Sequence, residues 1–297
     1  GGVIGNTVSL LLGIVWTRPR PGGLTDRATI AAGLRLGVPL MLAGVAQFVL
    51  SAGDRFVVQR MLGPEQVARY QVAYTVGNVL SLMLAFTTRA WLPRLKSITS
   101  SEQRWEVIAA SRDGVYWLVG WALIGITVSA PVLLRVFAPA SYDPASLVAV
   151  VLVVGLAALP VAASGATSQV LVTTRQSRPI AIGAAVAAVV KIVLTIAVIG
   201  RFGLVGTAAA TTVAIAAQAW VQRVAVQRAL GFRRSSATSL GFVALACLVS
   251  TASLELPQQG FWLAARFGFS CLCLAPFFLA LRGLQRGTGP LPLLRHP

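Results

Sequence analysis

The feature that most constrains this chain is a series of apolar runs, most of them as long as a membrane-spanning helix. The full-length runs lie at residues 36–57, 70–92, 114–136, 146–173, 179–199, 204–227, 238–256 and 261–281, and a partial run occupies residues 1–16. About 20 apolar residues in an α-helix cross the hydrocarbon core of a bilayer. Charged residues make up 11% of the chain, whereas soluble domains have about 25%. The sequence therefore predicts an all-α, polytopic transmembrane helical bundle.

Two other classes of protein fit the sequence poorly. A soluble all-helical core would show helices with one apolar and one polar face, but the run at 181–199 is apolar on nearly every side. The cysteines lie in apolar runs and the single histidine, His296, lies near the C-terminus. Neither a disulfide framework nor a metal-binding spacing is present, and there is no phosphate-binding loop or serine-hydrolase motif. We therefore predict no metal, no cofactor and no enzymatic activity.

The positive charges are distributed unequally between the connections that join the apolar runs. The formal net charge is +17, almost entirely from arginine. The connections form two sets that alternate along the chain. One set holds 17 basic and four acidic residues, and the other holds six basic and four acidic residues. Cytoplasmic connections of membrane proteins are enriched in Lys and Arg. The pattern predicts a cytoplasmic C-terminus, and it does not form the single basic face that a nucleic-acid-binding protein needs.

The adjacent pair Asp54-Arg55 ends the run at 36–57 and is predicted to lie on the outer side of the membrane. Charges beside a span are expensive, so they pair with each other, reach the interface or line a cavity. Two interpretations stay open. The pair contacts an anionic substrate at the outer mouth of a cavity, or it anchors the helix at the interface.

Lys191 lies inside the run at 179–199, far from either end. An ammonium group at this depth needs a cavity, a carboxylate or another acceptor. No acidic residue lies in the interior of any predicted span, so we expect an anionic ligand, water or helix carbonyls to serve. Lys191 is therefore the strongest single candidate for the substrate pathway.

Two further residues are candidates for a role in transport. Arg89 lies one turn inside the end of its run, where it reaches the cytoplasmic surface or contributes to the substrate pathway. Pro160 lies in the middle of the run at 146–173 and removes a backbone hydrogen bond. It is a candidate hinge, or only a bend.

A series of short segments follows in order along the chain: Gly37-Val38-Pro39, Asp54-Arg55-Phe56, Leu62-Gly63-Pro64-Glu65, Arg69-Tyr70, Ala73-Tyr74 and Trp91-Leu92-Pro93. In these segments, and more loosely to about residue 230, the chain resembles the C-terminal part of bacterial polysaccharide exporters of the O-antigen and teichoic-acid flippase type. These proteins belong to the multidrug/oligosaccharidyl-lipid/polysaccharide exporter superfamily.

The resemblance implies two six-helix lobes around a central cavity. Residues 1–16 would then end the last helix of a first lobe that precedes this chain, so we expect the chain to be a C-terminal fragment. Residues 17–35 would be a cytoplasmic linker and 36–230 the second lobe. Residues 238–281 would form two additional helices, followed by a disordered cytoplasmic tail at 282–297.

The activity implied by the resemblance is flipping of a polyprenyl-diphosphate-linked oligosaccharide across the bacterial inner membrane by alternating access. Lys191, Arg55 and Arg89 would attract its diphosphate or acidic sugars. The expected partners are this lipid-linked glycan, membrane lipids and other glycan-assembly proteins, with no nucleic acid. A cation-coupled multidrug exporter and a membrane-embedded glycan polymerase or ligase remain as alternatives.

Overall fold

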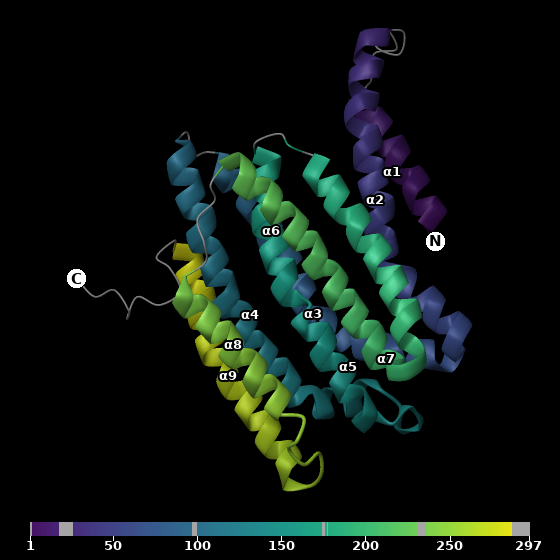
Figure 1. The fold of residues 1–297 in the computed structure, drawn as a ribbon, viewed down its shortest axis with the longest axis vertical. Coiled ribbons are helices and arrows are strands. Elements are labelled where there is room, and N and C mark those ends of the chain that lie inside the picture. Colours follow the sequence, from purple (N-terminus) through teal and green to yellow (C-terminus); the bar gives the residue numbers. More distant parts are fainter. Residues whose placement is uncertain are drawn as a thin grey trace, which may run out of the picture. The chain divides into compact units, whose positions relative to one another are not determined.

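The computed structural model of this chain describes residues 2–17, 26–96, 100–173, 176, 178–230 and 236–286. These residues form helices and contain no strand. The helices are α1 (Gly2–Thr17), α2 (Arg27–Leu62), α3 (Pro64–Lys96), α4 (Ser101–Phe137), α5 (Pro144–Leu156), α6 (Ala158–Thr173), α7 (Arg178–Leu230), α8 (Ala237–Ala252) and α9 (Phe261–Arg286) (Figure 1). The predicted all-α class is confirmed.

The chain divides into two compact units, Gly1–Leu42 and Ala43–Pro297. The first holds α1 and the beginning of α2, and the second holds all the later helices. Because α2 begins at Arg27, part of the expected linker at 17–35 is helical rather than irregular. Residues 287–297 of the expected tail lie outside the described residues.

Four segments among the described residues are long and apolar enough to cross a membrane. They are Ala110–Phe137, Pro144–Val172, Arg178–Gln227 and Phe261–Gly283. The expected runs at 36–57 and 70–92 are helical as well, as parts of α2 and α3. The chain is a polytopic helical membrane protein, as predicted.

The turn between α2 and α3 consists of Gly63 followed directly by Pro64. Gly63 has φ +91°, a left-handed conformation that glycine adopts without strain and that ends helices. Pro64 is the first residue of α3, where its missing N–H leaves no helical hydrogen bond unmade. This short turn places the end of α2 directly beside the beginning of α3.

The run at 146–173 is broken into α5 and α6 at Ala157. Pro160 lies three residues later and cannot donate a hydrogen bond to the carbonyl of Leu156. The Ala157 N–H instead donates to the carbonyl of Val154 at 3.2 Å, a tighter turn than an α-helix makes. The expected interruption by Pro160 is therefore present.

Helix α7 folds back on itself at Gly203, which has φ 53° and ψ −133°. Its two legs correspond to the expected spans at 179–199 and 204–227 (Figure 1). A Cβ atom on Gly183 would lie 3.4 Å from the carbonyl oxygen of Gln218. In one straight helix these residues would be about 50 Å apart, so the two legs are antiparallel neighbours.

The largest cluster of buried side chains lies among α3, α4, α5 and α7. Close approach is possible there because Gly77 of α3 has no side chain, and a Cβ atom at this position would lie 2.8 Å from the Val151 carbonyl oxygen. A second cluster joins α3, α4 and α6. Together the two clusters pack α3 against α4, α5, α6 and α7.

Helices α8 and α9 pack against α4 (Figure 1). The ring of Phe242 on α8 stacks on Trp117 of α4, with ring centroids 4.0 Å apart. The hydroxyl of Ser270 on α9 donates to the carbonyl of Gly125 at 2.9 Å. Small residues and interhelical hydrogen bonds are the usual means of packing helices within a membrane.

Candidate functional site

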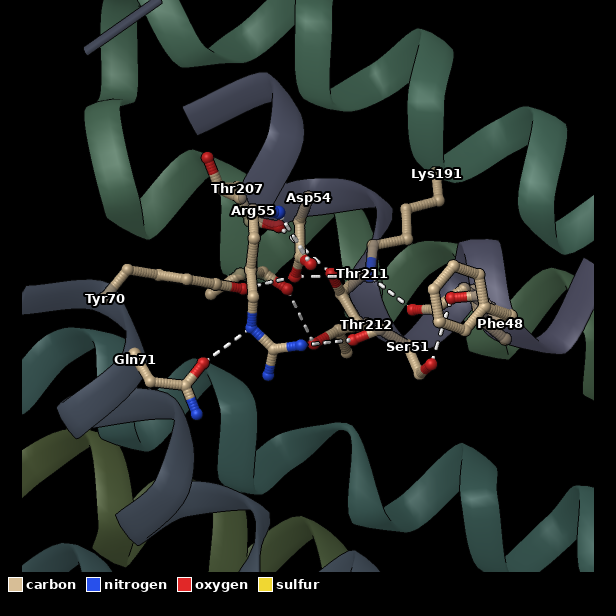
Figure 2. Close-up of polar contacts among 12 residues, drawn as sticks. Phe48, Ser51, Asp54, Arg55, Tyr70, Gln71, Lys191, Thr207, Thr211 and Thr212 are labelled. Carbon is tan, nitrogen blue, oxygen red and sulfur yellow. Dashed lines mark hydrogen bonds and ion pairs between the residues drawn. The ribbon is translucent and has the colours of Figure 1, made fainter. Parts of the chain in front are cut away.

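The charged pair Asp54-Arg55 lies within α2, and its two side chains occupy different environments. Consecutive residues of an α-helix point about 100° apart, so Asp54 and Arg55 cannot face the same neighbours. Asp54 is 1% exposed, whereas Arg55 is only half-buried. The two side chains do not form an ion pair with each other, and each has its own set of contacts (Figure 2).

The Asp54 carboxylate is surrounded by hydrogen-bond donors from three helices. One oxygen, Oδ2, lies 3.2 Å from the Lys191 Nζ on α7 and accepts from the Tyr70 hydroxyl on α3 at 2.9 Å. The other oxygen, Oδ1, accepts from the backbone N–H of Arg55 at 3.0 Å. Both oxygens of the buried carboxylate are therefore satisfied.

Lys191 has a carboxylate partner after all. Its side chain is fully buried, and its ammonium pairs with Asp54 and donates to the Leu50 carbonyl. The expectation that no acidic residue could reach it was wrong. It treated Asp54 as a residue of the helix end, whereas α2 continues to Leu62 and Asp54 lies within it.

The ion pair joins α2, α3 and the first leg of α7. Figure 2 shows Thr207 and Thr211 of the second leg beside the same group of side chains. Removing one partner of a buried ion pair typically costs about 3–5 kcal/mol, because a desolvated charge remains. The Asp54–Lys191 ion pair, together with the Tyr70 hydroxyl, therefore holds α2, α3 and α7 together. We call these three side chains the tie.

Asp54 and Lys191 neutralise each other, so the positive charge of Arg55 has no negative counterpart in this group of side chains. Its Nε donates to the Gln71 Oε1 at 2.5 Å and its Nη1 donates to the Ser51 carbonyl at 3.2 Å. The guanidinium also lies 5.3 Å from the centre of the Tyr74 ring. All these partners are neutral, so the guanidinium is oriented by hydrogen bonds and a cation–π contact and keeps its full charge.

A comparison with protein families identifies the part of the chain that supplies most of this site. Residues 1–99 match the family model described as polysaccharide biosynthesis protein. This part of the chain is similar to that family. The resemblance expected from the sequence is confirmed for these residues. No curated protein matches the chain.

The family match covers the ion-pair site unequally. Asp54, Arg55, Tyr70 and Gln71 all lie within the matched residues, and Lys191 lies outside them. The polysaccharide biosynthesis segment thus contains the half-buried arginine together with the residues that orient it.

Two other residues were candidates from the sequence, Arg89 and Pro160. Arg89 lies on α3, but its side chain lies outside the described part of the structure. Pro160 lies on α6 and is not among the described hydrogen-bond or ion-pair partners of Asp54. The substrate-pathway role of Arg89 and the hinge role of Pro160 both stay predictions.

The sequence reasoning did not identify a second polar cluster, between α6 and the second leg of α7. The Oε1 of the fully buried Gln222 accepts from the hydroxyls of Ser164, Thr167 and Ser168 at 2.9, 3.2 and 3.1 Å. The hydroxyl residues occupy positions i, i+3 and i+4, which share one face of a helix. This spacing within an apolar run was the signal that could have revealed it.

No metal centre is evident in this part of the molecule. Among the described residues, no group of three His, Cys, Asp or Glu side chains is arranged to hold a metal ion.

Proposed function

We propose that this chain is part of a transporter that moves a lipid-linked oligosaccharide across the bacterial inner membrane. The site around Arg55 would hold the anionic part of that substrate. The observation that carries the proposal is the charge balance of the site. Lys191 is neutralised by Asp54, and Arg55 remains half-buried with neutral partners only.

The chemistry of the substrate class fits this site. A polyprenyl-diphosphate-linked glycan carries its negative charge at the diphosphate, and Arg is the side chain best suited to bind phosphate oxygens. A guanidinium that is already oriented by Gln71 and Tyr74 loses less conformational freedom on binding than a free one does.

The family match and the apolar helices support the membrane and polysaccharide parts of the proposal. The expected orientation places the C-terminus in the cytoplasm and Arg55 towards the outer side, following the positive-inside rule. On this view, alternating access exposes Arg55 to each side of the membrane in turn.

The test is an export assay in a strain that lacks the chromosomal gene and expresses variants of the complete protein. Arg55→Gln keeps a hydrogen-bonding side chain but removes the charge. We expect surface polysaccharide per unit of membrane-inserted protein to fall at least about tenfold, the effect of losing a hydrogen bond to a charged group. Lipid-linked oligosaccharide should accumulate inside the cell.

The matched control is Arg60→Gln, which removes the same charge from an exposed position on the same helix. It should leave export within about twofold of the wild type, because exposed charges contribute little. Normal export by Arg55→Gln at normal abundance would contradict the proposal.

A further inference from the structure

Arg266 of α9 is a buried arginine with no acidic partner among the described residues. It is 2% exposed, yet it takes part in neither of the ion pairs found there. Its Nη2 donates to the carbonyls of Ser253 and Leu256, the latter at 3.3 Å. Its Nε and Nη1 have no hydrogen-bond partner. A buried cation with two unused donor groups is costly unless something anionic accepts from them.

Arg266 is one of the residues that line a cavity of about 470 Å³ among α4, α8 and α9. Apart from Ser253, the other described residues that line it are apolar and include Val128, Trp262 and Phe269, and none of these described residues is acidic. A volume of this size is typical of a small-molecule site with one or two fixed polar groups. The cavity therefore has an apolar wall, and Arg266 is the charged residue among the described residues that line it.

The cavity opens where a lipid can reach it. Only 17% of the apolar window of α9 is buried within the protein. Phe269, which lines the cavity, is 47% exposed, and Leu272 further along α9 is 71% exposed. In a membrane protein such a helix faces the acyl chains of the bilayer.

We propose that this cavity binds an anionic phospholipid of the surrounding bilayer. The Arg266 side chain would turn Nε and Nη1, which are enclosed by the protein in this structure, towards the cavity, where they would donate to the phosphate. An acyl chain would lie against Phe269 and the exposed face of α9. The site lies on α4, α8 and α9, outside the residues that match the polysaccharide biosynthesis family. It therefore does not depend on the function proposed for Arg55.

A phospholipid fits the site better than a lipid-linked glycan does. Among the described residues that line the cavity, only Ser253 and Arg266 have polar side chains that could bind sugars. Its volume suits a phosphate with a small headgroup.

The experiment is native mass spectrometry of the purified chain, titrated separately with phosphatidylglycerol, phosphatidylcholine and undecaprenyl phosphate. We expect the wild type to bind phosphatidylglycerol several-fold more tightly than the zwitterionic phosphatidylcholine. Arg266→Gln should weaken phosphatidylglycerol binding about tenfold, the effect of losing a hydrogen bond to a charged group. Arg201→Gln, at an exposed arginine, should leave it unchanged.

A second variant keeps the test decisive if Arg266→Gln fails to fold. Ala265→Trp retains the arginine and places a bulky ring at a residue that lines the cavity. It should weaken phosphatidylglycerol binding as strongly as Arg266→Gln does. Equal binding by the wild type and both folded variants would overturn the proposal. Tighter binding of undecaprenyl phosphate than of phosphatidylglycerol would also overturn it, since the lipid would then be the glycan carrier.

Discussion

Lys191 and Arg266 are both buried cations in apolar helices, but their surroundings differ. Lys191 lies 3.2 Å from the carboxylate of Asp54, which also accepts from Tyr70. Arg266 donates only to two backbone carbonyls and keeps two donor groups unused beside a cavity. The difference lies in whether a carboxylate is close enough to pair with the buried cation. A buried cation that pairs with a carboxylate holds two helices together, whereas one that has no carboxylate partner remains available for a ligand.

The same reasoning separates the two members of the Asp54-Arg55 pair. Asp54 pairs with Lys191 and accepts from Tyr70, and its carboxylate forms no ion pair with the Arg55 guanidinium. Arg55 is held by neutral groups and stays half-buried. Arg55 therefore replaces Lys191 as the best candidate for contact with an anionic substrate.

The largest expected effect comes from removing the cation of the tie. Lys191→Met leaves Asp54 desolvated with one donor fewer, so we expect a loss of about 3–5 kcal/mol of stability. The measurement is thermal unfolding of the purified protein in detergent. Asp54→Asn combined with Lys191→Met removes both charges and keeps an acceptor for Tyr70, and it should recover most of the loss. If the double variant were as unstable as Lys191→Met alone, the loss would not come from an unpaired Asp54 charge, and the proposed role of the ion pair would be wrong.

A smaller effect is expected from the third member of the tie. Tyr70→Phe removes the hydroxyl that donates to Asp54 at 2.9 Å. A hydrogen bond to a charged group contributes about 1.5–3 kcal/mol, and unfolding should shift accordingly. Tyr74→Phe is the matched control, because the Tyr74 ring contacts Arg55 while its hydroxyl has no contact with Asp54 among the hydrogen bonds described. Equal shifts for the two variants would show that Tyr70 does not belong to the tie.

In the region around α8 and α9, we expect side-chain packing to contribute more to the stability of the protein than charged groups do. A Cβ atom on Gly120 would lie 2.4 Å from the Phe242 ring, which is itself stacked on Trp117. Gly120→Ala should therefore destabilise the protein by about 1–3 kcal/mol. Gly241→Ala, at a helix position with open space around it, is the control and should have no such cost. The same thermal unfolding measurement distinguishes the two.

The smallest effect is expected at Arg266. Arg266→Met in lipid-free detergent removes two hydrogen bonds to carbonyls but also an uncompensated buried charge, so the two contributions offset each other. We expect a change within about 1 kcal/mol, far below that of Lys191→Met. A loss comparable to that of Lys191→Met would show that Arg266 is a structural tie too.

The sequence predicts the helical class well because hydropathy reports directly on burial in a bilayer. The interruption by Pro160 follows from its missing N–H, and the turn at Gly63-Pro64 from the conformations of these residues. The partner of Lys191 was missed because it lies 137 positions earlier in the chain. Such a contact depends on how α2 packs against α7, which no local pattern encodes. The cavity at Arg266 was missed for the same reason.

The most direct test of this account compares export by two variants of the complete protein at matched abundance. Asp54→Asn with Lys191→Met removes the tie but leaves Arg55 and its partners in place, whereas Arg55→Gln removes only the free charge. The account predicts surface polysaccharide near the wild-type level for the double variant and at least about tenfold less for Arg55→Gln. Loss of export in the double variant with normal export by Arg55→Gln would contradict it.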